Sequence, residues 1–180
     1  LWANMVLHLE PQPQLLLRRW NAHINTQGFL MFSCLGPDTL RELRSVYAAQ
    51  GWPLPHHPFT DMHDWGDMLV YSGFAEPVMD MERLTLTYSS GATLLNDLRG
   101  LGRKWHAGRP TGLRSRQWRQ RLIAALEAGL PRDADGRLQL TVEVVYGHAF
   151  KAPPRPAKGP AGETAVAMED MRAMLRAGRR

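Results

Sequence analysis

Residues 1–35, LWANMVLHLEPQPQLLLRRWNAHINTQGFLMFSCL, decide the fold. Leu1–Leu9 is a short, mostly apolar run of the kind that forms a buried strand. Pro11 and Pro13 then favour the start of a helix, whose apolar residues follow helical spacing. After this helix comes Phe29–Leu35, a second apolar run that is typical of a strand covered on both faces. The stretch therefore predicts a strand, a helix and a second strand.

The alternation of helices and strands continues to about residue 150. Apolar residues at helical spacing predict further helices at residues 40–47, 61–72, 92–101 and 115–128. Strict alternation of apolar and polar residues predicts further strands at Arg83–Tyr88 and Leu138–Tyr146. Strands that are separated by helices indicate a mostly parallel sheet covered by helices, so the predicted fold class is α/β.

Residues 151–180 differ in composition from the residues before them. Residues 151–163 are rich in proline and glycine, which predicts a flexible linker. Residues 164–180 carry a weak helical stripe and predict a marginal helix or a disordered basic tail. Of the formal charge of +5, the segment from Lys151 to Arg180 contributes +4, so residues 1–150 are close to neutral. Because no basic stripe is predicted on a folded face, we expect no nucleic-acid binding.

The composition excludes several classes of protein. With 44% hydrophobic and 22% charged residues among 180, the chain is typical of a globular domain. No apolar run approaches the roughly 18 residues of a membrane-spanning helix, so we expect no membrane insertion. The lone cysteine, Cys34, excludes a disulfide scaffold and a multi-cysteine zinc site. No leader or presequence is recognised at the start of the chain, so we expect a cytoplasmic protein.

Several segments of the chain together resemble one family. Leu1–Leu9, the helix after it and Gly28–Phe32 (GFLMF) resemble the fourth and fifth strands of class I S-adenosylmethionine-dependent methyltransferases. More particular similarities lie in residues 32–43 (FSCLGPDTLREL), 57–68 (HPFTDMHDWGDM), 72–88, 94–102 (LLNDLRGLG) and 143–148 (EVVYGH). These segments are similar to the bacterial malonyl-[acyl-carrier-protein] O-methyltransferases of biotin synthesis. They are also similar to a mitochondrial relative, a complex I assembly factor of methyltransferase fold that hydroxylates arginine.

The resemblance covers roughly residues 1–150 and implies a Rossmann-like sheet. In the family the strand order is 3-2-1-4-5-7-6 and the last strand is antiparallel. Leu1–Leu9, Phe29–Leu35, Arg83–Tyr88 and Leu138–Tyr146 would be strands four, five, six and seven, in the order 4-5-7-6. Strands one to three have no counterpart here, nor have the glycine-rich loop and the acidic residue that hold the cofactor. Residues 1–150 are therefore expected to be the C-terminal part of a methyltransferase domain from a longer protein.

The resemblance also implies which residues lie near the cofactor and the substrate. The residues at the end of strand four would contact S-adenosylmethionine, namely Ala3, Asn4, Met5 and His8. Without the resemblance, Asn4 is a strand-end asparagine and His8 an ordinary loop histidine. Cys34, His57 and Phe59 would line the substrate side, because ligands of α/β sheets bind at the carboxyl ends of strands. For Cys34, the alternative is a buried inert thiol.

One cluster of polar residues contains metal-ligating side chains. Its members are His56, His57, Asp61, His63, Asp64 and Asp67. Their spacing matches no familiar metal signature, and Asp61 and Asp64 also suit the first turn of the helix that follows. We therefore predict no metal site.

Residues 98–126 contain no acidic residue but many arginines and lysines. The run comprises Arg99, Arg103, Lys104, Arg109, Arg114, Arg116, Arg119 and Arg121. A run of this kind is usually a solvated helix face. Because acyl carrier proteins are strongly acidic, Arg114, Arg116 and Arg119 could instead form a docking surface for malonyl-acyl carrier protein.

The predicted activity is transfer of a methyl group from S-adenosylmethionine to the free carboxylate of malonyl-[acyl-carrier protein]. A sulfonium is already activated and a carboxylate is already a nucleophile, so alignment in a dry cleft suffices. No catalytic residue is assigned for this reason. The alternatives are a non-catalytic assembly or binding protein and an arginine hydroxylase of methyltransferase-like fold.

Overall fold

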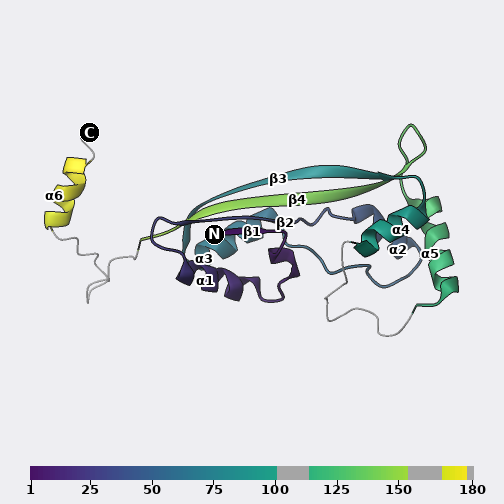
Figure 1. Ribbon diagram of the computed structural model, residues 1–180, viewed down its shortest axis with the longest axis horizontal. Helices are drawn as coiled ribbons and strands as arrows, with labels where there is room; N and C mark the ends of the chain where they lie inside the picture. Colours follow the sequence, from purple (N-terminus) through teal and green to yellow (C-terminus); the bar gives the residue numbers. More distant parts are fainter. Residues whose placement is uncertain (101–113, 154–167, 178–180) are drawn as a thin grey trace.

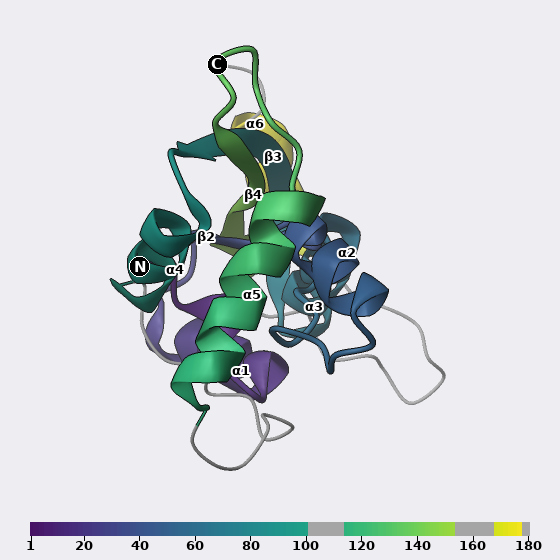
Figure 2. The same cartoon turned by 90° about the vertical axis from the view of Figure 1, so that its right-hand side faces the viewer.

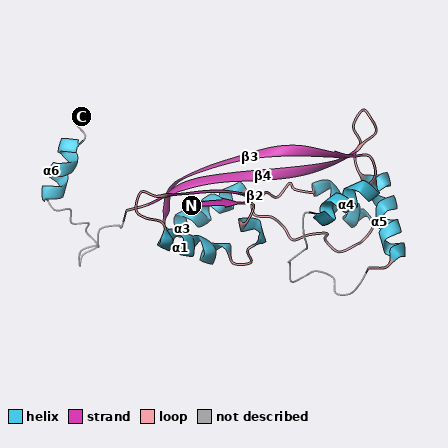
Figure 3. Cartoon of the chain, viewed as in Figure 1, coloured by secondary structure: helices cyan, strands magenta, loops and turns pink. Residues whose placement is uncertain are grey.

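The computed structural model describes residues 1–100, 114–153 and 168–177. The strands are β1 (Trp2–Asn4), β2 (Phe29–Leu35), β3 (Phe74–Tyr88) and β4 (Leu138–Lys151). The helices are α1 (Pro13–His23), α2 (Arg41–Ala49), α3 (Met62–Tyr71), α4 (Gly91–Gly100), α5 (Arg116–Gly129) and α6 (Met168–Ala177), with a short 3₁₀ helix, η1 (Leu7–Leu9). Figure 1 and Figure 3 show that β3 and β4 form a long antiparallel pair that runs along most of the body.

The four strands form one sheet in the order β1-β2-β4-β3. This order corresponds to 4-5-7-6, as the family resemblance implied. β1 and β2 are parallel, whereas β4 is antiparallel to both β2 and β3. The prediction of a mostly parallel sheet was therefore right in that β1, β2 and β3 run in the same direction. It was wrong about which kind of pairing predominates, because most neighbouring strands are antiparallel. β4 runs in the opposite direction and lies between β2 and β3, so it makes two of the three pairings antiparallel.

The strand bounds differ from the prediction at three places. β1 ends at Asn4 because the chain turns out of the sheet at Met5, whose φ is +54°. β3 begins at Phe74, well before the predicted Arg83, and its register shifts between Ala75 and Val78. β4 continues past Tyr146 to Lys151. The predicted bounds of β2 are confirmed.

Two hydrophobic cores lie at the two ends of the paired strands β3 and β4. The first contains α1 and α3 packed on β2 and β4, with Trp65, Phe32 and Leu17 almost fully buried. The second contains α2, α4 and α5, which pack on Leu138 and Leu140. In Figure 2, α5 crosses the front of the molecule with α4 and α2 on its two sides.

The two cores use opposite faces of β4. The first core contains odd-numbered residues such as Val145 and Ala149, and the second contains the even-numbered Leu138 and Leu140. Because side chains of a strand alternate between faces, β4 changes its buried face between its two ends. This change explains why consecutive residues are buried in the middle of β4, where a half-buried strand would alternate.

The face of the sheet opposite the first core carries exposed apolar side chains. Trp2 pairs with Met31, Met31 with His148 and His148 with Val78, so these side chains share one face. Trp2 is 78% exposed and Val78 is 64% exposed. Phe29 also lies on this face and is about half exposed.

Among the described residues, no helix has the length and apolar character of a membrane span.

Candidate functional site

The carboxyl ends of β1 and β2 lie side by side because the two strands are parallel. Asn4 is paired with Ser33, and the Ser33 hydroxyl donates a hydrogen bond to Asn4 Oδ1. The backbone N–H of Met5 donates to the Ser33 carbonyl at 2.9 Å and contacts the Ser33 hydroxyl at 3.2 Å. Ser33 therefore fixes both the Asn4 side chain and the left-handed turn at Met5. No motif in the sequence indicated this role of Ser33.

His8 lies beyond this turn, in η1, and is neutral. Burial, together with the nearby charge of His57, lowers the pKa of His8 from 6.5 to about 4. The backbone N–H of Leu35 points at His8 Nδ1 at 3.4 Å, a long contact in which Nδ1 is the acceptor. An accepting Nδ1 places the proton of the neutral ring on Nε2. The site therefore has no protonated imidazole from His8 at neutral pH.

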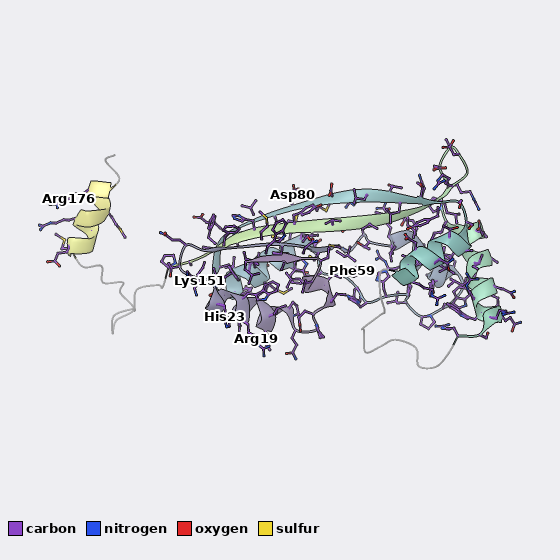
Figure 4. The ribbon with its side chains drawn as sticks, in the orientation of Figure 1. Arg19, His23, Phe59, Asp80, Lys151 and Arg176 are labelled. Atoms are coloured by element: carbon purple, nitrogen blue, oxygen red, sulfur yellow. The ribbon has the colours of Figure 1, made fainter. Side chains whose placement is uncertain are left out.

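The loop between α2 and α3 brings His57 and Phe59 against His8. His57 Nε2 donates to the backbone carbonyl of His8 at 2.9 Å. The Phe59 ring lies 4.8 Å from the His57 ring and 5.9 Å from the His8 ring, both edge to face, and stacks on His56 at 5.0 Å. In Figure 4, Phe59 lies between the α1–α3 pair and the group of α2, α4 and α5. Residues predicted separately for the cofactor side and the substrate side thus meet in one cluster.

Two predicted site residues have side chains that the structure does not bring to this surface. Cys34 is fully buried in the first core, and burial raises the pKa of its thiol to about 12. Ala3 is 7% exposed and packs in the same core. Both residues lie on the helix-covered face, because strand residues alternate. The structure agrees with the alternative that Cys34 is a buried, inert thiol.

Phe59 also lines a cavity of about 500 Å³. Gln14, Thr60 and Tyr71 line it, together with the exposed carboxylates of Asp64 and Asp67. Asp61 caps α3, since its side chain accepts the backbone N–H of His63 at 2.8 Å, and Asp64 lies in the first turn, which confirms their predicted helical roles. Among the described residues, no three His, Cys, Asp or Glu side chains are placed to hold a metal ion.

A buried glutamate that the sequence analysis missed fixes the loop after β2. Glu143 is 2% exposed, and its Oε2 accepts the backbone N–H of Asp38 at 2.9 Å. Its Oε1 lies 3.3 Å from the Arg83 guanidinium, which also pairs with Asp38 at 2.9 Å. The Thr39 hydroxyl donates to the Glu143 carbonyl at 3.0 Å. A Cβ on Gly36 would lie 2.5 Å from Glu143 Oε2, so a side chain at this position would force the Glu143 carboxylate to move.

The predicted docking arginines lie at the start of α5 and just before it. Arg114, Arg116 and Arg119 are all exposed. The guanidinium of Arg114 lies over the ring of Trp118, 4.0 Å from its centroid. Arg103, Lys104 and Arg109 of the same basic run lie outside the described residues.

Comparison with known proteins adds sequence relatives and structural neighbours. No protein-family model matches the chain. A malonyl-[acyl-carrier protein] O-methyltransferase of Laribacter hongkongensis is 43% identical over 156 residues, 86% of this chain and 52% of that protein. Its namesake in Gallionella capsiferriformans is 51% identical over 133 residues, 73% of this chain and 45% of that protein. The chain spans about half the length of the curated relatives it matches.

Solved structures support the fold. A protein of Bacillus halodurans described as a methyltransferase superposes with a TM-score of 0.53 at 13% identity, over 84% of this chain and 63% of that one. The YcgJ protein of Bacillus subtilis gives a TM-score of 0.52 at 10% identity, over 85% and 63%. Together with the 4-5-7-6 sheet, these superpositions show that the chain has the fold of class I methyltransferases. Within that class, its sequence is similar to the malonyl-[acyl-carrier protein] O-methyltransferases, as the motifs indicated.

Proposed function

We propose that the protein containing this chain transfers a methyl group from S-adenosylmethionine to the free carboxylate of malonyl-[acyl-carrier protein], a step of biotin biosynthesis. The observation that carries this proposal is the identity of 51% over 133 residues with a relative of that name. The class I sheet supports it, because the ends of β1 and β2 form the side of such a sheet where ligands bind.

The residues at these strand ends fit S-adenosylmethionine. When bound, this cofactor supplies a methyl group on a positively charged sulfur. His8 is neutral and so adds no repulsive charge. The aromatic ring of Phe59 lies beside the rings of His8 and His57. The face of an aromatic ring attracts cations, such as the positively charged sulfur of the cofactor. Asn4, held by Ser33, and the turn at Met5 provide polar groups for the cofactor, while Ala3 contributes backbone only.

For the substrate side, we propose that His57 and Phe59 align the malonyl carboxylate. His57 is held by the His8 carbonyl, so the loop that carries both residues has a fixed position against η1. Alignment and exclusion of water are what the reaction needs, since donor and nucleophile are already reactive. Cys34 would then act only by packing beneath the site.

We propose further that residues 1–150 are part of a larger methyltransferase domain, followed by a linker at 151–163 and a basic tail at 164–180. The exposed apolar face and the open edge of β1 support this organisation, because sheets rarely leave such surfaces uncovered. The remainder of the domain would supply the glycine-rich loop and the acidic residue for the cofactor. The mass of the native protein tests this point, since a mass equal to that of the 180-residue chain would contradict it.

The protein partner in this proposal is acyl carrier protein, which would dock on Arg114, Arg116 and Arg119 in the cytoplasm. The positive charge of this surface and the exposure of all three side chains support docking of an acidic protein. The arginine hydroxylase and the non-catalytic assembly role receive less support, because the relatives compared are named O-methyltransferases.

The decisive experiment combines the protein with malonyl-acyl carrier protein and S-adenosylmethionine labelled in its methyl group. Label should appear on the carrier as a methyl ester, and base hydrolysis should release it. As a matched control, acetyl-carrier protein lacks the free carboxylate and should gain no label. Expression of the full coding sequence should also restore growth of a strain that requires biotin. Absence of both label and growth would refute the proposal.

A further inference from the structure

Three aromatic rings form a partly open surface where α2 meets α5. Tyr47 lies near the end of α2, Trp52 just after it, and Trp118 in the first turn of α5. The rings of Tyr47 and Trp52 meet edge to face at 5.3 Å, and those of Trp52 and Trp118 lie 5.8 Å apart. All three side chains pack on the second core but remain partly exposed. We refer to Tyr47, Trp52 and Trp118 as the aromatic shelf.

Arg114 holds a positive charge over this shelf. Its guanidinium lies 4.0 Å from the Trp118 ring centroid, and the same charge acts on the Tyr47 hydroxyl. Unlike Arg83 and Arg132, which bind carboxylates, Arg114 makes no ion pair with any described residue. Its N–H groups are therefore oriented by the ring below them and can still bind an anion.

The shelf is connected to the candidate site by one loop. Trp52 and Phe59 belong to the same segment between α2 and α3. Phe59 is seven positions after Trp52, so the two residues lie within about 25 Å of each other. Arg116 and Arg119 are exposed on α5 close to Trp118 in sequence. The basic surface, the shelf and the His57–Phe59 cluster thus follow one another along neighbouring elements.

We propose that the aromatic shelf and Arg114 bind the thioester arm of the carrier-linked substrate, while Arg116 and Arg119 contact the acidic protein that bears the arm. This inference rests on the proposed function. Such an arm carries a phosphodiester at its root, followed by methyl groups and amides. Arg114 suits the phosphodiester through charged hydrogen bonds, and the ring faces suit the methyl and amide groups. The acyl end would then extend along the 52–59 loop towards Phe59.

The test measures binding rather than catalysis, by titration calorimetry with acyl carrier protein in two forms. The apo form lacks the arm, and the malonyl form carries it. The unaltered protein should bind the malonyl form about tenfold more tightly. Arg114→Ala should weaken binding of the malonyl form more than binding of the apo form, so that the difference between the two forms shrinks. The double variant Arg116→Ala/Arg119→Ala should weaken both forms by a similar factor, because it acts on the protein surface.

Arg19→Ala is the matched control, since Arg19 is an exposed arginine on α1, far from α5 in Figure 4. It should change neither affinity. Equal affinity of the unaltered protein for the two carrier forms, or an equal effect of Arg114→Ala on both, would overturn the inference. Failure of the proposed function is a separate result, because it shows as absent methyl transfer whatever the binding. Thermal unfolding of Arg114→Ala, whose exposed side chain lies outside both cores, checks that the variant is folded.

Discussion

Substitution of Glu143 by glutamine tests whether this buried carboxylate holds the loop at the end of β2. Glutamine has nearly the same size, so the change removes charge without leaving a cavity. Its amide oxygen can still accept the Asp38 N–H that now lies 2.9 Å from Glu143 Oε2. Its amide N–H₂ group must then face the Arg83 guanidinium, which places two donors against each other.

The magnitude follows from the two interactions that change. A hydrogen bond to a carboxylate contributes about 1.5–3 kcal/mol and a neutral one about 0.5–1.5 kcal/mol, so the Asp38 bond weakens by about 1 kcal/mol. Because the Arg83 side chain is 49% exposed, solvent screening limits its ion pair with Glu143 to about 1 kcal/mol. We therefore expect Glu143→Gln to lower the free energy of unfolding by about 2 kcal/mol, with a fall in Tm of about 4–8 °C.

Urea unfolding followed by tryptophan fluorescence measures this difference. The matched control is Glu76→Gln, which removes a carboxylate that is exposed on β3 and makes no ion pair with a described residue. The control should change the free energy of unfolding by less than about 0.5 kcal/mol. If Glu143→Gln were no more destabilising than Glu76→Gln, the argument that Glu143 anchors this loop would be refuted.

Three other changes test the packing and titration of the first core and the site. Because burial lowers the pKa of His8 to about 4, the unfolded chain takes up a proton first as pH falls through 6.5, so the free energy of unfolding should decrease between pH 6.5 and 4. For a partly buried ring we expect a loss of about 1–2 kcal/mol, which His8→Asn should remove in urea titrations across that range. Gly147→Ala would place a Cβ 2.2 Å from Phe32 Cε1, so it should cost about 2–3 kcal/mol by denaturant unfolding, and rescue by Phe32→Leu would support this cause. Cys34, with a pKa of about 12, should resist an aromatic disulfide reagent at pH 8 until urea unfolds the chain, and prompt labelling of the folded protein would contradict its burial.

Much of the fold was predictable because local patterns agreed with the final packing. Phe29–Leu35 had the predicted bounds, and the sheet order followed from the family motifs. The first half of β3 was missed because residues 74–82 contain Pro77 and acidic residues and show no clean alternation. The structure accommodates Pro77 at the register shift between Ala75 and Val78, where a missing N–H leaves no gap in the ladder.

The sequence predicted several residues of the candidate site, but it did not predict which of them contact one another. His8, His57 and Phe59 were identified from motifs, yet nothing local shows that the His57 ring binds the His8 carbonyl 49 residues away. No local pattern in the sequence predicted that Glu143 is buried, because its hydrogen-bond partner Thr39 lies 104 residues earlier in the chain. Cys34 was placed beside the substrate because strand ends bind ligands, but the alternation of strand side chains turns it towards the core.

β2 has apolar residues on both faces, although only one of its faces is buried. Its apolar run predicted a strand covered on both faces, whereas in the structure α1 and α3 cover one face and no described helix covers the other. Phe29 and Met31 therefore stay 48% and 43% exposed, beside the more exposed Trp2 on β1. A half-buried strand normally places polar residues on its open face, so the apolar residues here support our proposal that the rest of a larger domain packs on this face. The same reasoning does not extend to the middle of β3, where the exposed Asp80 and Glu82 lie on that face in place of apolar residues.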